Sequence, residues 1–427
     1  MSEWQEVRLG DVLDKIVGGG TPSKENPSYW DGGDIFWCSV KDMSDDKFRI
    51  LQTKDTITLD GLNNSSANLI PKGTVITATR MGLGRAFINE TDMAINQDLK
   101  ALIPNSNINN KYLLWTIILY RNYIEMLGNG ATVKGIRLET LKNIKINLPP
   151  LPAQQKIAKI LSNYDDLIEN NLKRIKLLEE SARLTYEEWF LRFRIDGKKL
   201  EIDSDTKLPF GWKKVKVNSL VSYYIGGGWG EESISDDFSD KAYVIRGTDI
   251  NDIPYGNLEG APLRCHKASN LASRKLQNKD IIFEVSGGSK TEGVAKTLLM
   301  TDNLLEQFNN DVMCASFCKL VRPKEQCLGN LLHLSFKYLR NSKATEVFEI
   351  KSASSIINYN WEAFIKHQDL IMPSHDVLLN FDKKVDVLVN EIYNLGHQNQ
   401  LLQEARDILL PRLMTNVIDT DELDIAV

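Results

Sequence analysis

Apolar residues recur at spacings of alternately four and three positions in residues 157–189 and 381–413. This heptad pattern predicts two long helices that each bury one side against another helix. The predicted seam positions are Ile157, Leu161, Tyr164, Ile168, Asn171, Ile175, Leu178, Ala182, Thr185 and Trp189 in the first helix, and Phe381, Val385, Leu388, Ile392, Leu395, Asn399, Leu402, Arg406, Leu409 and Leu413 in the second. We expect an antiparallel coiled coil, and the alternative is that each helix packs only on its own globular domain.

Two asparagines, Asn171 and Asn399, interrupt the apolar seams. A buried asparagine can fix the register of a coiled coil, whereas a solvated one has no such effect. The pattern leaves both interpretations open.

The stretches that precede the two helices consist of short apolar runs bounded by Gly, Pro, Asn and Asp. This pattern predicts strands and loops with one or two short helices. The expected fold class is therefore α+β, with two repeated globular domains of mixed strands and short helices joined by the two long helices. The expected domains are 1–147 and 196–372, the latter beginning with the linker Asp196–Pro209, with helices in 148–195 and 373–416 and an acidic tail in 417–427.

An internal repeat supports the prediction of two related domains. Trp4 and Trp212 are each followed, 14 residues later, by three glycines, and the two helices align without gaps at an offset of 224. Similar short motifs follow in the same order: Lys41-Asp42-Met43 with Thr248-Asp249-Ile250, and Asn96-Gln97-Asp98 with Asn309-Asn310-Asp311.

The composition is that of a globular protein, with 42% hydrophobic and 26% charged residues. No apolar run is long enough for a membrane span, and the polar N-terminal residues predict no secretory signal. The five cysteines form no CxxC pair, which favours a reducing cytoplasm over a disulfide framework or a zinc site. Lys and Arg balance Asp and Glu in both domains, at 17 against 17 in residues 1–150 and 23 against 23 in residues 196–373. Neither domain is therefore basic, and DNA binding would need local patches or a partner.

Motifs of the common nucleic-acid enzymes are missing from the sequence. It has no P-loop, and Asn147-Leu148-Pro149-Pro150 has one residue too many for the loop of an adenine methyltransferase. The acidic segment 280–286 lacks the lysine that a nuclease would need there. These observations predict a chain without catalysis of its own.

Loops of both domains carry side chains of the kinds that hydrogen-bond to base edges and phosphates. For each of these residues alone, an ordinary solvated loop is the alternative. The candidates are Lys41, Thr79, Arg80, Arg85, Asn96, Gln97, Lys134 and Arg137 in the first domain, and Ser289, Lys290, Asn309, Asn310, Ser352 and Ser354 in the second.

Three segments carry a resemblance to a known family: Gly19-Gly20-Thr21-Pro22-Ser23, Pro71-Lys72-Gly73-Thr74-Val75, and the run from Leu148 to Ala158 that leads into the first long helix. With these segments the chain resembles the specificity (S) subunits of Type I restriction–modification systems over nearly its whole length. The second copy departs from the pattern, since Gly228-Trp229-Gly230 stands in place of Thr-Pro-Ser.

The resemblance implies two target recognition domains, each reading one half of a bipartite, asymmetric site in double-stranded DNA. It implies that the helices set the gap between the halves and dock two methyltransferase (M) subunits, with restriction (R) subunits joining for cleavage in phage defence. S-adenosylmethionine, ATP and Mg²⁺ would belong to those partners. The alternatives are a self-contained or fused DNA adenine methyltransferase or restriction enzyme, and a coiled-coil scaffold without DNA readout. The residues expected to form the coiled coil and to dock subunits are Ile157, Leu161, Tyr164, Ile168, Ile175, Leu178, Phe381, Val385, Leu388, Ile392, Leu395 and Leu402.

Overall fold

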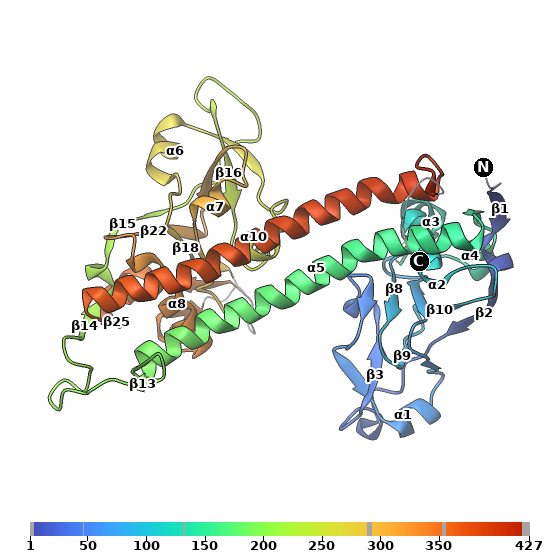
Figure 1. Cartoon of the computed structure of the whole chain (residues 1–427), viewed down its shortest axis with the longest axis horizontal. Coiled ribbons are helices and arrows are strands. Elements are labelled where there is room, and N and C mark those ends of the chain that lie inside the picture. The colour runs from blue at the N-terminus through green and yellow to red at the C-terminus, as the bar shows by residue number, and fades with distance from the viewer. Residues whose placement is uncertain (1–3, 46, 131–132, 288–292, 352–355, 421–427) are drawn as a thin grey trace. The chain divides into compact units, whose positions relative to one another are not determined.

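The computed structural model describes residues 4–45, 47–130, 133–287, 293–351 and 356–420. Contacts divide the chain into two compact units, of which the first contains Met1–Leu167 and Leu402–Val427 and the second Ile168–Leu401. Each unit therefore combines one globular module with part of each of two long helices, α5 (Leu151–Tyr186) and α10 (His375–Met414) (Figure 1).

Module 1, in the first unit, is built on three sheets with the strand orders β2-β10-β7-β8-β4, β5-β3-β9-β6 and β1-β11. Its central strands come from short apolar runs, and all four residues of β7 are buried. The strands are β1 (Gln5–Arg8), β2 (Leu13–Gly18), β3 (Ile35–Cys38), β4 (Arg49–Ile50), β5 (Asp55–Ile57), β6 (Leu69–Ile70), β7 (Val75–Ala78), β8 (Ala86–Asn89), β9 (Met93–Ile95), β10 (Leu99–Pro104) and β11 (Lys145–Leu148). The helices are α1 (Leu59–Asn63), α2 (Asn110–Leu119), α3 (Arg121–Leu127) and α4 (Leu138–Lys142).

Module 2, in the second unit, has sheets with the orders β15-β22-β18-β20, β17-β16-β21, β14-β25 and β19-β24-β23. Its strands are β14 (Lys213–Lys216), β15 (Val221–Gly226), β16 (Asp240–Ile245), β17 (Leu263–His266), β18 (Ile281–Glu284), β19 (Ser286–Gly287), β20 (Thr297–Leu299), β21 (Asp311–Cys314), β22 (Cys318–Pro323), β23 (Glu349–Lys351), β24 (Ile357–Tyr359) and β25 (Asp369–Met372). Its helices are α6 (Ala268–Arg274), α7 (Asp302–Leu305), α8 (Leu328–Asn341) and α9 (Trp361–His367). A hairpin, β12 (Arg194–Ile195) and β13 (Lys198–Lys199), precedes the module.

The two modules share one topology. The order β2-β10-β7-β8 corresponds to β15-β22-β18-β20, and β5-β3-β9 corresponds to β17-β16-β21. In both of the smaller sheets one pair is parallel, β3 with β9 and β16 with β21. The predicted duplication of an α+β module is therefore confirmed.

One motif pairing predicted from the sequence is correct at the level of backbone geometry. Asp42 accepts a hydrogen bond from the backbone N–H of Ser39 at 2.8 Å, and Asp249 accepts one from that of Arg246 at 2.8 Å. Both aspartates thus close the same turn after equivalent strands, β3 and β16.

Another motif pairing is wrong. Asn96-Gln97-Asp98 forms the turn after β9, whereas Asn309 and Asn310 come before β21, the strand equivalent to β9. The two motifs lie at opposite ends of equivalent strands, and the true counterpart of Asn96-Gln97-Asp98 is Ala315-Ser316-Phe317. Asn and Asp favour turns at either end of a strand, so a polar tripeptide alone does not identify the end.

Within the first unit, the start of α5 packs against the end of α10. Ile157, Leu161 and Leu413 share one apolar cluster, and the guanidinium of Arg406 lies 2.8 Å from the carboxylate of Asp165.

Within the second unit, the end of α5 packs against the start of α10. Arg174 pairs with Glu391 at 2.8 Å, and the ring centroids of Trp189 and Phe381 are 5.6 Å apart. The start of α5 meets the end of α10 in the first unit and the end of α5 meets the start of α10 in the second, so the predicted antiparallel pairing is observed in each unit.

The two asparagines belong to the buried seam. Asn171 and Asn399 are only 6% and 1% exposed. Asn171 precedes Trp189 by 18 residues and Asn399 follows Phe381 by 18, so the antiparallel register that pairs Trp189 with Phe381 sets the asparagines opposite each other. The interpretation as solvated positions is therefore wrong, because both side chains are withdrawn from water.

Candidate nucleic-acid interface

Three loops of module 1 are joined by backbone hydrogen bonds into one surface, which we call loop cluster 1: residues 79–85, 96–98 and 133–137. The N–H of Thr79 donates to the carbonyl of Asp98 at 2.8 Å, and the N–H of Ile136 donates to the carbonyl of Thr79 at 3.0 Å. The N–H of Met81 also donates to the carbonyl of Lys134 at 3.4 Å. Segments that are distant in sequence thus present their side chains together.

Loop cluster 1 exposes Arg80, Gln97 and Lys134. The guanidinium of Arg80 is 52% exposed and lies 3.5 Å from the carboxylate of Asp98, which is 9% exposed. The ammonium of Lys100 donates to the carbonyl of Gln97 at 2.7 Å. Burial lowers the pKa of the Lys100 ammonium. The nearby carboxylate of Asp98 raises this pKa, and the positive charge of Arg80 lowers it further. The backbone hydrogen bonds between the three loops thus bring cationic and amide groups together on one surface.

Two of the predicted DNA-contacting residues are instead internal to the turn. Thr79 and Asn96 are only 4% and 6% exposed. The hydroxyl of Thr79 donates to the carbonyl of Asp98 at 3.1 Å, and the amide of Asn96 donates to the carboxylate of Asp98 at 3.2 Å. Because these groups are buried and already hydrogen-bonded, we correct their role from base contact to turn formation.

The remaining candidates of module 1 lie at its surface in different settings. Arg85 is 2.6 Å from the carboxylate of Asp45, which also pairs with Arg121 at 2.9 Å. Burial raises the pKa of Asp45, but the ion pairs with Arg121 and Arg85 outweigh it and leave the pKa below its ordinary value. Arg85 is therefore engaged within the module. Lys41, in a 3-10 turn after β3, and Arg137, at the start of α4, are exposed.

Module 2 repeats this frame in loop cluster 2, formed by residues 285–287, 315–317 and 356–359. The N–H of Val285 donates to the carbonyl of Phe317 at 2.9 Å, and the N–H of Tyr359 donates to the carbonyl of Val285 at 2.8 Å. These bonds match those of Thr79 and Ile136 in loop cluster 1.

The predicted candidates of module 2 do not lie among the described residues of loop cluster 2. Asn309 and Asn310 are exposed, but they lie at the end of β21 opposite the turn 315–317. The other four candidates, Ser289, Lys290, Ser352 and Ser354, fall outside the described residues.

Sequence reasoning placed Ser286 in the loop that corresponds to residues 77–85, but it missed Phe317 and Asn358, which the fold brings beside Ser286 in loop cluster 2. A signal for them was present in the glycine motifs. The N–H of Gly20 donates to the carbonyl of Ile95 at 2.9 Å, and that of Gly228 donates to the carbonyl of Cys314 at 3.0 Å. Aligning the glycines that hold these strand ends would have paired the turns that follow Ile95 and Cys314.

The residues expected both to form the coiled coil and to dock partner subunits are withdrawn from the surface. Eight of them are buried and the other four are partly buried, so they stabilise the helix pair and present little surface to another protein. The buried ones are Ile157, Leu161, Ile168, Ile175, Phe381, Val385, Ile392 and Leu395, and the partly buried ones are Tyr164, Leu178, Leu388 and Leu402. We therefore correct the docking part of that prediction, because a partner needs exposed side chains.

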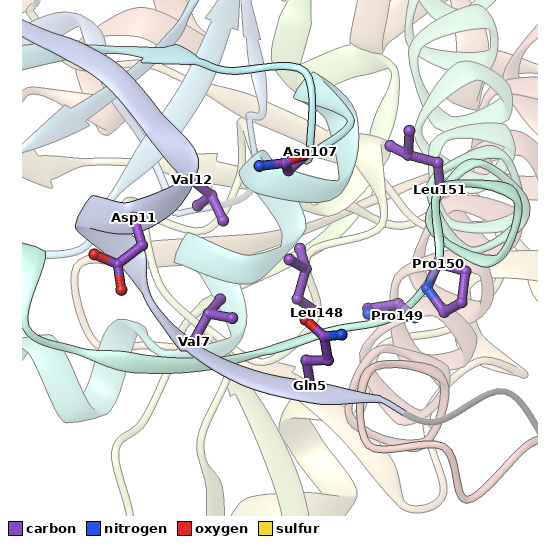
Figure 2. A pocket seen from close by; sticks show the side chains of 9 residues that line it. All are labelled: Gln5, Val7, Asp11, Val12, Asn107, Leu148, Pro149, Pro150 and Leu151. Atoms are coloured by element: carbon purple, nitrogen blue, oxygen red, sulfur yellow. The ribbon is translucent and has the colours of Figure 1, made fainter.

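A cavity of about 430 Å³ lies in the first unit, apart from loop cluster 1. Its only acidic lining residue, Asp11, accepts two hydrogen bonds from Arg8, at 2.9 and 3.0 Å. The lining, shown in Figure 2, is Gln5, Val7, Asp11, Val12, Asn107, Leu148, Pro149, Pro150 and Leu151. One carboxylate already paired with an arginine provides no acid–base couple for catalysis.

Two further observations concern the part of the chain that the structure describes. No three or more His, Cys, Asp or Glu side chains gather there as a metal site would require. None of the helices in these residues is long and apolar enough to cross a membrane.

Comparison with known proteins relates the chain to one family. Residues 1–180 match the family model described as the Type I restriction modification DNA specificity domain. The chain is 26% identical over 433 residues to the Type I restriction enzyme MjaIX specificity subunit of Methanocaldococcus jannaschii, covering 99% of this chain and 95% of that protein. It is 34% identical over 172 residues to the EcoR124I/EcoR124II specificity subunit of Escherichia coli, 39% of this chain and 41% of that protein.

A solved structure shows the same fold. The S subunit of the Type I restriction–modification system of M. genitalium aligns with a TM-score of 0.57 and 15% identity, over 97% of this chain and 96% of that one. Two repeated modules and two long helices are thus the fold that this chain shares with an S subunit. Residues 1–180 match the DNA specificity domain of Type I restriction–modification systems, and the chain is similar over almost its whole length to a specificity subunit of such a system, in agreement with the resemblance of the sequence motifs.

Proposed function

We propose that each module of this DNA-recognition subunit reads one half of a bipartite, asymmetric site. The observation that carries the proposal is the pair of loop clusters, which share a backbone frame but differ in their side chains. Where cluster 1 has Arg80 and Asp98, cluster 2 has Ser286 and Phe317. Two readers built on one frame with different side chains would select two different short sequences.

In module 1, Arg80 is the residue best placed for sequence readout. Its exposed guanidinium can donate two hydrogen bonds to O6 and N7 of a guanine, the commonest specific contact in the major groove. Lys134, on the neighbouring loop, would hold a phosphate and so position the module without selecting a base.

Catalysis belongs to the partner subunits with which a specificity subunit forms its complex. The finer proposal is two M subunits, joined by R subunits, with S-adenosylmethionine, ATP and Mg²⁺ bound by those partners. Exposed apolar side chains recur at equivalent positions of the two helices, Leu177 and Leu401, which are 70% and 51% exposed. One heptad further on, Leu184 and Ile408 are 39% and 54% exposed. Duplicated apolar faces outside the seam favour two copies of one docking partner.

The helices would set the gap between the two half-sites, because α5 and α10 each contribute residues to both units. The proposed function also places the chain in the cytoplasm, where its DNA and partner subunits would be.

The experiment compares the full chain alone, the M subunit alone and the two together, in methyl transfer and in binding to a library of duplexes. We expect methylation at one bipartite sequence only when both proteins are present. Methyl transfer by this chain alone would identify it as a self-contained methyltransferase. Methylation by the M subunit that is equally sequence-specific without this chain would reduce the chain to a scaffold.

A further inference from the structure

The turn Ala315-Ser316-Phe317 of module 2 has the same backbone bonding as the turn Asn96-Gln97-Asp98 of module 1. The first N–H of each turn donates to the end of the neighbouring parallel strand, Ala315 to Ile245 at 2.8 Å and Asn96 to Cys38 at 2.9 Å. The residue after each turn closes it, since Cys318 donates to Ala315 at 2.9 Å and Leu99 to Asn96 at 3.3 Å. Phe317 therefore takes the place of Asp98.

The two side chains at this equivalent place behave in opposite ways. The carboxylate of Asp98 is 9% exposed and turned toward Arg80, whereas Phe317 is 62% exposed. The backbone of Phe317 is nevertheless fixed, because its carbonyl accepts from the N–H groups of both Val285 and Ser286, at 2.9 and 3.2 Å. A single exposed apolar side chain is common on proteins. Phe317 differs from such a side chain because it stands on a hydrogen-bonded turn within the proposed reading surface.

The described residues of loop cluster 2 all have neutral side chains, whereas loop cluster 1 carries Arg80 and Lys134. Ser286 stands in the place of Arg80, and its hydroxyl lies 2.8 Å from the side-chain oxygen of Asn358. Asn358 pairs directly with both Ser286 and Ile350 across the small sheet, so these three side chains share one face. Ile350 is 53% exposed. The described part of this surface therefore offers apolar and amide groups.

The chemistry of base edges selects a ligand for such a surface. In the major groove, thymine alone among the four bases presents a methyl group, beside its O4 acceptor, and apolar side chains including Phe contact it. We propose that Phe317 is a specificity-determining residue that contacts the 5-methyl group of a thymine in the half-site read by module 2. The proposal rests on the proposed function, because it assigns a base to one of the two readers.

The test uses the full chain in complex with its M subunit. The recognised site is first selected from random duplexes, and the half assigned to module 2 is the half that changes when that module is exchanged. Each thymine of that half, on either strand, is then replaced singly by uracil, which lacks only the methyl group. At one position we expect binding to weaken about 4-fold, as for the loss of one buried methyl group. In the Phe317→Ser complex, thymine and uracil at that position should bind equally.

Two controls isolate the contact. Val347→Ser removes another apolar side chain of module 2, 80% exposed and outside loop cluster 2, and should keep the preference for thymine over uracil. Replacing thymine by uracil in the half-site read by module 1 should change the binding of the wild-type and Phe317→Ser complexes by the same factor.

Several results would overturn the proposal. The first is a half-site without any thymine. The second is wild-type binding that does not weaken at any thymine replaced by uracil, and the third is a weakening by uracil that persists in the Phe317→Ser complex. Binding that weakens in Phe317→Ser equally with thymine and uracil, with no uracil effect in the wild type, would indicate a ring inserted between base steps instead. If the wild-type complex bound selected and scrambled duplexes equally, the proposed function itself would fail, which is a distinct result.

Discussion

The guanidinium of Arg406 on α10 donates to the carboxylate of Asp165 on α5 at 2.8 Å, and the side chains are only 4% and 14% exposed. The same guanidinium lies over the ring of Phe48, 4.7 Å from its centroid. A buried ion pair thus links the helix pair to module 1 within the first unit.

Arg406→Ala should destabilise the chain strongly. Removing one partner of a buried ion pair leaves the other charge buried and uncompensated, which costs about 3–5 kcal/mol. We expect the urea midpoint of the transition that involves the first unit to fall accordingly. The control is Arg183→Ala, which removes an arginine of α5 that is 44% exposed and paired along the same helix with Glu180. Equal effects of the two variants would contradict a special role for the buried pair.

The free energy of unfolding should depend on pH through the titration of Asp165. Burial raises its pKa to about 6, although Arg406 and Arg49 lower it. A carboxyl whose pKa is higher in the folded chain stabilises the fold below its unfolded pKa of about 3.9, and this contribution is lost as the pH rises through 6. The free energy of unfolding of the wild type, minus that of Asp165→Asn, should therefore decrease between pH 4 and pH 7. A difference that increases over this range would show that the pairing with Arg406 dominates.

Gly396→Ala should destabilise the second unit even though alanine favours helices. A Cβ at Gly396 would lie 2.6 Å from the carbonyl oxygen of Pro254 and 3.0 Å from the backbone nitrogen of Gly256. Overpacking of this kind costs about 1–3 kcal/mol, which outweighs the gain of about 1 kcal/mol in helix propensity. Gly226→Ala is the control, because its Cβ would meet nothing within 4 Å. Thermal unfolding of both variants measures the effect, and a more stable Gly396→Ala would refute the contact.

Arg80→Ala and Lys134→Ala should weaken DNA binding in different ways. Loss of Arg80 should cost about 1–3 kcal/mol and relax one position in the half-site of module 1. Loss of Lys134 should weaken all sequences alike and reduce the slope of affinity against salt by about 1. Binding titrations of the complex at several salt concentrations distinguish the two. Lys145→Ala, an exposed lysine outside loop cluster 1 paired with Glu6, is the matched control and should leave both readouts unchanged.

The long helices were predictable from the sequence because a heptad repeat is a local signal. Arg406 occupies a seam position, and the sequence alone gave no sign that Asp165 would meet it there. The sheets of the modules depend on pairings between distant strands, so their ends were harder to align. This is why the resemblance between Asn96-Gln97 and Asn309-Asn310 misled the alignment of the reading loops. Thr79 and Asn96 form the turn because they are buried, and the composition of a polar turn does not reveal which of its side chains are buried.

The central claim is that the two modules read DNA independently, and exchanging one of them tests this most directly. Residues 1–147 are replaced by the corresponding module of a related specificity subunit, and the sites methylated by the complex with its M subunit are mapped across a genome. We expect one half of the recognised site to change while the other half is retained. A site in which both halves change together, or in which neither half changes, would contradict the claim.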